Sequence, residues 1–126
     1  MFDALQLFSD DQALVADAYS TSAVAVNKTP HDGVDIEICV TAGATVDPIL
    51  VRVLAKSADS AWDYTNETQK IGQVNFVAPT TAAPQRKVIH VQTKLAYLKL
   101  HYDGTGWGTA TVTAGIVSGQ QRDMGA

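Results

Sequence analysis

The stretch VDIEICV, residues 34–40, alternates apolar side chains with polar or small ones. One set consists only of Val and Ile, and the other set consists of Asp35, Glu37 and Cys39. A period of two places successive side chains on opposite faces of a β-strand. We therefore expect a strand with one face in a core and one face toward solvent, as in an antiparallel sheet.

The same alternation recurs along the chain. ILVRVLA, residues 49–55, is apolar on both faces, so we expect this strand to be buried on both sides. Further clear strands are expected at 87–92, 96–102 and 109–117, and weaker ones at 5–8, 13–20, 22–27 and 73–77. Turn-forming Gly, Pro and Asp residues separate these segments. The pattern predicts an all-β fold, a jelly-roll-like β-sandwich or barrel of about eight short antiparallel strands.

The chain has 126 residues, which is the length of one domain. We expect a single domain spanning residues 1–126, with an N-terminal docking arm at 1–12 and a flexible C-terminal tail at 118–126. Charged residues make up 17% of the chain, below the usual share of about a quarter. Such a low share indicates that a partner covers part of the surface.

The charge pattern and the single cysteine exclude several classes of partner and site. The net charge is −4, with −7 in residues 1–63 and +3 in residues 64–126, so the two halves attract each other within a chain or between copies. No run of Lys or Arg marks a nucleic-acid-binding surface, and no apolar stretch approaches the ~20 residues of a membrane span. Cys39 is the single cysteine of the chain, and this excludes an internal disulfide and a cysteine-based zinc site. With an acidic start unlike a secretory signal, these features favour a protein made in a reducing cytoplasm, with no nucleic-acid or membrane partner.

Two groups of residues were weighed for catalysis or metal binding. Asp35 and Glu37 point to one side of a strand about 7 Å apart, a separation that a glycosidase uses and that any solvated strand face also provides. We favour the solvated face. The sequence allows His90 and His101 to face each other on neighbouring strands, without a carboxylate to complete a metal site. We therefore predict a protein that is not an enzyme, with no catalytic residue, no metal site and no cofactor.

Aromatic residues in two loops are the candidate binding residues. The segment 57–70, SADSAWDYTNETQK, carries Trp62 and Tyr64. The glycine-rich loop DGTGWG, residues 103–108, carries Trp107, and because a strand follows it rather than a helix it is not a dinucleotide-binding motif. Such aromatics can plug the end of a sandwich, anchor a protein interface or stack on sugar rings. The sequence leaves these three interpretations open.

Three segments resemble, in order, the capsid cement (decoration) proteins of tailed bacteriophages, of the Bordetella-phage type. DALQLFSDDQAL, residues 3–14, is similar to the opening of that family. LAKSADSAW, residues 54–62, resembles its mid-chain strand and loop. LAYLKLHYDGTGWGTATVTAGIV, residues 95–117, resembles its closing hairpin. Together the segments span nearly the whole chain.

The resemblance implies a jelly-roll-like domain on the exterior of a virion capsid. It implies a partner, the major capsid protein, whose neighbouring subunits are clamped together, and self-association as a homodimer or homotrimer. It adds no catalytic residue and no cofactor. The predicted interface residues are Phe2, Leu5, Leu7, Phe8, Trp62, Tyr64 and Trp107. The alternative hypothesis is a carbohydrate-binding module on a virion or cell surface, with Trp62, Tyr64 and Trp107 as stacking residues.

Overall fold

The computed structural model describes residues 7–14, 16–26, 33–42, 48–76, 85–104 and 110–118. Within these ranges the chain forms nine strands and no helix, and no helix that could cross a membrane is found there. The strands are β1 (Leu7–Leu14), β2 (Ala18–Tyr19), β3 (Val24–Ala25), β4 (Val34–Ala42), β5 (Ile49–Lys56), β6 (Lys70–Phe76), β7 (Gln85–Val91), β8 (Tyr97–Gly104) and β9 (Ala110–Ser118). The predicted all-β fold is confirmed.

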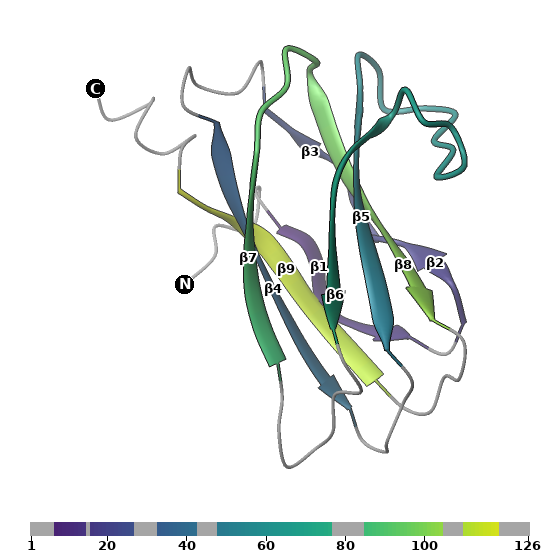
Figure 1. Cartoon of the computed structure of the whole chain (residues 1–126), viewed down its shortest axis with the longest axis vertical. Coiled ribbons are helices and arrows are strands. Elements are labelled where there is room, and N and C mark those ends of the chain that lie inside the picture. The colour runs from purple at the N-terminus through teal and green to yellow at the C-terminus, as the bar shows by residue number, and fades with distance from the viewer. Residues whose placement is uncertain are drawn as a thin grey trace.

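Two antiparallel sheets pack face to face (Figure 1). The first sheet has the strand order β1-β9-β4-β7. The second sheet has the order β2-β8-β5-β6, and β3 also pairs with β8. Strands that follow one another in the chain therefore often belong to different sheets, as β4 and β5 do. This is the arrangement of a jelly-roll-like β-sandwich.

The core lies between the two sheets, and its residues come from alternate positions of each strand. On β4 the four apolar residues of the 34–40 stretch are fully buried, whereas Asp35, Glu37 and Cys39 on the other face are partly exposed. Ile49, Val51 and Val53 of β5 face them from the second sheet and are also fully buried. Burial of apolar area on this scale is the main stabilising contribution to such a fold.

The two sheets contact each other at both edges of the sandwich. At one edge β6 contacts β7, and the missing side chain of Gly72 makes room for Ile89 and Val91. At the other edge the Ser22 amide donates a hydrogen bond of 3.1 Å to the Phe8 carbonyl oxygen. These contacts hold the two sheets together, although β6 and β7 are end strands of different sheets and do not pair with each other.

The N-terminal strands differ from the prediction of one strand at 13–20. The chain leaves the first sheet after Leu14 and enters the second sheet at Ala18, so that segment cannot be a single strand. Strand β1 also contains register shifts against β9, and Asp11 has a φ of 51°, which marks an irregular, bulged strand. The irregularity obscures the alternation that the sequence prediction relied on.

Part of the predicted docking arm at residues 1–12 belongs to the sandwich. Phe8 is fully buried in the core, and Leu7 is half-buried at the start of β1. Phe8 therefore contributes to the folding of its own chain and offers no free surface. Phe2 and Leu5 lie outside the described residues, as does the predicted tail beyond Ser118.

One polar interaction crosses the core and generates a test. The hydroxyls of Tyr102 and Ser9 share a buried hydrogen bond of 2.7 Å, and Ser9 also donates to Gln12 Oε1 at 2.6 Å. Because Ser9 donates its only hydroxyl hydrogen to Gln12, the Tyr102 hydroxyl is the donor in its hydrogen bond with Ser9. Burial raises the pKa of Tyr102 well above its ordinary value, which keeps the phenol protonated.

We expect Tyr102→Phe to lower the free energy of unfolding by about 1–2 kcal/mol, because it removes this buried hydrogen bond. Tyr97→Phe, on the half-exposed side of the same strand, is the control and should change it by less than about 0.5 kcal/mol. Urea denaturation of the three proteins measures both values. Equal effects of the two substitutions would contradict the assignment.

Candidate functional site

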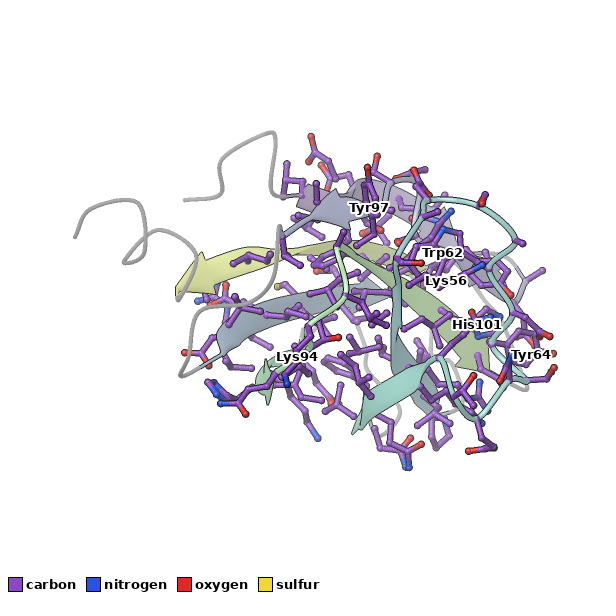
Figure 2. The ribbon with its side chains drawn as sticks, turned by 90° about the horizontal axis from the view of Figure 1, so that it is seen from above. Lys56, Trp62, Tyr64, Lys94, Tyr97 and His101 are labelled. Atoms are coloured by element: carbon purple, nitrogen blue, oxygen red, sulfur yellow. The ribbon has the colours of Figure 1, made fainter. Side chains whose placement is uncertain are left out.

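Strand β5 is apolar on its outer face as well as on its inner face. Leu54 points away from the core, toward the side of the second sheet that would otherwise meet solvent, and it is nevertheless 0% exposed. The loop at residues 57–69 lies over this face (Figure 2). The two-sided burial predicted for residues 49–55 therefore holds at Leu54, where a loop is the cover, whereas Leu50 and Arg52 on the same face are partly exposed.

The loop is organised by its own polar side chains. Asp63 Oδ1 accepts hydrogen bonds from the hydroxyl and the amide of Thr65, and these bonds lower the pKa of Asp63. Asn66 Oδ1 accepts the equivalent pair from Thr68. The Asp63 amide donates to Gln69 Oε1 at 2.9 Å, which ties the middle of the loop to its end. These are Asx-type turns, which fix the backbone without a regular element.

The hydroxyl of Tyr19 attaches the loop to β2. It donates a hydrogen bond of 3.2 Å to the Trp62 carbonyl oxygen and accepts one of 3.0 Å from the Tyr64 amide. The Trp62 indole N–H donates to Asp59 Oδ1 at 2.8 Å. The ammonium of Lys56 donates to the carbonyl oxygens of Ser60 and Ala61, just before Trp62. The positions of Trp62 and Tyr64 are thus set by hydrogen bonds on both sides.

Tyr64 lies on a polar and aromatic cluster of the sheet. Its ring stacks on the His101 imidazole at 3.9 Å between centroids and 7° between planes, and Tyr19 meets the same imidazole edge-on at 4.8 Å. Arg52 lies 5.3 Å from the Tyr64 ring and forms a salt bridge of 2.8 Å with Asp103. Burial lowers the pKa of His101, and the neighbouring Arg52 charge lowers it further. His101 is therefore neutral at pH 7.

We call Tyr19, Trp62, Tyr64, Lys99 and His101 the aromatic platform. Figure 2 shows Trp62 beside Lys56, with Tyr64 and His101 farther along the same face and Lys94 apart from them. Trp62 and Tyr64 are both half-buried, so each ring keeps an accessible part. The loop does cover apolar surface, but it does so on the outer face of the second sheet and not at the end of the sandwich.

Only two members of the platform, Trp62 and Tyr64, are among the binding residues that the sequence predicts. Tyr19, Lys99 and His101 are further members that the structure adds. The signal for two of them was present in AYLKLHY, residues 96–102, where Lys99 and His101 share the outward face of one strand. Trp107 lies outside the described residues.

The outer face of the first sheet carries the other candidates. Asp35 and Glu37 share this face as predicted, and each faces a base: His90 lies 2.6 Å from Asp35, and Arg86 lies 3.5 Å from Glu37. The expectation that His90 could face His101 is wrong, because β7 and β8 belong to different sheets. Within the described residues, no three His, Cys, Asp or Glu side chains are grouped so that they could hold a metal ion.

Comparisons with known proteins give similarities of fold. No family model and no curated protein matches the chain, so nothing in them links it to the capsid cement proteins. Among solved structures, a glycoside hydrolase family 43 arabinoxylan arabinofuranohydrolase from Bacillus subtilis, in complex with cellotetraose, is 16% identical with a TM-score of 0.51. That match covers 84% of this chain and 20% of the hydrolase chain. The chain thus spans only about a fifth of that protein, and the match shows a shared sandwich fold.

Two further solved structures are more distant. The C-terminal CBM6 of LamC, a marine laminarinase from Zobellia galactanivorans, is 11% identical with a TM-score of 0.44, covering 79% of this chain and 73% of that chain. The structure of the infectious bursal disease virus Gx strain is 6% identical with a TM-score of 0.47, covering 87% of this chain and 30% of that chain. β-Sandwiches from a virus and from carbohydrate-active proteins are therefore both among the structural neighbours. At these scores neither supports one function over the other.

We expect Leu54→Ala to lower the free energy of unfolding by about 2–4 kcal/mol and to loosen the loop, because it leaves a cavity under the loop. Leu50→Ala is the matched control, since Leu50 lies on the same face of β5 but is half-exposed. Denaturation, together with limited proteolysis within residues 57–69, measures the two effects. If Leu50→Ala and Leu54→Ala behaved alike, the loop would not be the cover of Leu54.

We expect His101 to make stability depend on pH. Because its pKa is lowered from 6.5 in the folded protein, the unfolded chain binds more protons below about pH 6.5. The contribution of neutral His101 to the free energy of unfolding is present above about pH 6.5 and is lost as the pH falls through the pKa of His101 in the folded protein. Asp103 and Asp17, which face the same ring, oppose the shift without reversing it.

The measurement is the free energy of unfolding at pH 7.5 and pH 5 for the wild type and His101→Gln. We expect the wild type to lose more stability on acidification than the variant does. Parallel losses in the two proteins would show that His101 does not carry the pH dependence.

Proposed function

We propose that this protein is a capsid cement protein of a bacteriophage, an adhesion protein without catalytic activity. It binds the outside of the capsid and holds neighbouring major capsid protein subunits together. It is made in the cytoplasm of the host bacterium and ends on the exterior of the virion. The ordered resemblance of residues 3–14, 54–62 and 95–117 supports this proposal.

The observation that carries the proposal is the composition of the outer face of the first sheet. Its two central strands, β4 and β9, present small uncharged residues, namely Cys39, Thr41, Thr111, Thr113 and Gly115. Toward β1, the Thr113 hydroxyl donates a hydrogen bond to the Asp11 carboxylate. Toward β7, Glu37 forms a salt bridge with Arg86, and Asp35 lies 2.6 Å from His90, which is charged only when protonated. Protein interfaces are depleted of charge at their centre and polar at their rim. This face fits that description better than a solvated surface does.

The size of the face fits an attachment that uses several copies. Four strands about 4.8 Å apart and eight residues of about 3.4 Å each make a face of roughly 500 Å². One partner in a standard interface contributes about 800 Å², so the face supplies part of one strong contact. A homodimer or homotrimer would engage two or three such contacts at once and gain affinity through effective concentration.

The second candidate function, binding of carbohydrate, rests on a different observation. The aromatic platform presents Trp62 and Tyr64 in fixed positions, because the Tyr19 hydroxyl holds both of their backbones. Rings that are ordered before binding lose little entropy when a ligand stacks on them. The two candidates use opposite sheets, so both can hold for one protein.

We expect the protein to co-sediment saturably with expanded shells of its source virus that were assembled without it. Thr111→Arg, which puts an unpaired charge at the centre of the first-sheet face, should weaken this binding at least tenfold, a loss of about 1.4 kcal/mol or more. Gln73→Arg is the matched control, because Gln73 is an exposed strand residue on the second sheet.

Absence of saturable binding by the wild type would reject the capsid function. Equal weakening by Thr111→Arg and Gln73→Arg would reject the first-sheet face as the attachment surface.

A further inference from the structure

Lys99 lies at the centre of the aromatic platform, and no carboxylate of the described residues forms a salt bridge with it. Its Nζ lies 5.6 Å from the centroid of the Tyr19 ring and 6.0 Å from that of the Trp62 ring. The side chain is half-buried. Among the described residues, two other cations of this sheet are neutralised, Arg52 by Asp103 and Lys70 by Glu67, but no carboxylate pairs with Lys99. Two rings favour a cation, yet they do not cancel its charge.

A second positive charge lies on the same side of Trp62. In the register of β5 and β8, Lys99 is opposite Leu54, and Lys56 is opposite Tyr97. Leu54 points to the outer face of the second sheet, and residues two apart on a strand share a face. Both lysines therefore extend from that outer face. The Lys56 ammonium binds the carbonyl oxygens of Ser60 and Ala61, which are dipoles and not anions. Two lysines that pair with no carboxylate of the described residues therefore lie near one indole ring, in a protein whose net charge is −4.

The chemistry around the two lysines indicates the kind of ligand. In the described part of the chain the exposed large hydrophobic residues are Val88 and Leu95, and neither belongs to the platform. The platform instead offers partly exposed rings, the polar side chains of the loop and unneutralised ammonium groups. A ligand that suits it has a ring to stack, hydroxyl groups and a negative charge.

We propose that Lys99, Lys56 and Trp62 form a binding site for a carboxylate-bearing sugar, such as a uronic acid residue of a polysaccharide. The carboxylate binds the Lys99 ammonium, the sugar ring packs on Trp62, and Lys56 adds long-range attraction. Binding converts a bare half-buried charge into a charge-assisted hydrogen bond, which is among the stronger polar contacts. This proposal deepens the carbohydrate-binding candidate and is independent of the capsid attachment through the first sheet.

The experiment is isothermal titration of the full chain with two probes that differ only in charge. Tetragalacturonate carries four carboxylates, and its fully methyl-esterified form keeps the rings and loses the charge. We expect the wild type to bind the acid at least tenfold more tightly than the ester, with an affinity that falls as salt is raised.

The variants assign the effect to named side chains. Lys99→Gln should weaken binding of the acid by about tenfold, as expected for one charge-assisted hydrogen bond at a partly exposed position. Lys99→Arg should retain most of it, and Trp62→Ala should weaken both acid and ester. Lys70→Gln is the control, because Glu67 already neutralises Lys70, and it should bind like the wild type. Near-ultraviolet circular dichroism checks that each variant is folded.

The following outcomes would each contradict the proposal, and each rejects a different part of it. Equal binding of acid and ester leaves carbohydrate binding in place and rejects the charge selectivity. Unchanged binding by Lys99→Gln rejects the site, and tighter binding of polyglutamate than of tetragalacturonate shows an acidic protein to be the ligand. If neither sugar binds, both the proposed site and the carbohydrate-binding function are rejected. The capsid function is tested separately, by the sedimentation assay.

Discussion

Strand β5 is apolar on both faces, and a two-layer sandwich can cover only one of them. The inner face is covered by the first sheet, so Leu54 on the outer face must be covered by something else. The loop at residues 57–69 is the cover, and the Tyr19 hydroxyl attaches it to β2. Burying a leucine side chain stabilises by about 2 kcal/mol, which a short polar loop could not obtain from its own turns. The arrangement of the aromatic platform follows from this need.

The two outer faces of the sandwich have different chemistry. Within the described residues, the first sheet presents small uncharged side chains, the Glu37–Arg86 ion pair and the Asp35–His90 contact, whereas the second sheet presents aromatic rings and two lysines, Lys56 and Lys99, without carboxylate partners. Chemistry of the first kind suits the centre of a protein contact, and chemistry of the second kind suits a polar anionic ligand. A protein with two such faces can be attached through one and remain accessible through the other.

Local sequence pattern predicted the fold class and the faces of the strands well. The alternation at 34–40 agrees with the burial in the structure, and the two-sided apolar pattern at 49–55 agrees with it at Leu54 but not at the partly exposed Leu50. The pattern did not reveal which strands pair, and that is why His90 and His101 were placed near each other although they lie in different sheets. The bulged β1, with Asp11 at positive φ, shows the other limit, since an extra residue disturbs the alternation that defines a strand.

The candidate site was predictable only in part, for the same reason. Trp62 and Tyr64 could be selected because aromatics in a long polar loop call for an explanation. Tyr19 could not, because its role depends on contacts between segments far apart in the chain, and the outward face shared by Lys99 and His101 gave no indication of their aromatic neighbours. Phe8 was assigned to an interface on its apolar character alone, and the structure buries it in the core. Apolar character indicates that a side chain leaves water, but only topology decides which surface covers it.

The orientation of the protein on a particle tests the central claim most directly. The measurement is a cryo-electron microscopy reconstruction of expanded shells saturated with the protein. The account predicts density in which the first sheet lies against the shell and the loop at 57–69 points outward. Density with the aromatic platform against the shell, or shells without added density, would contradict it.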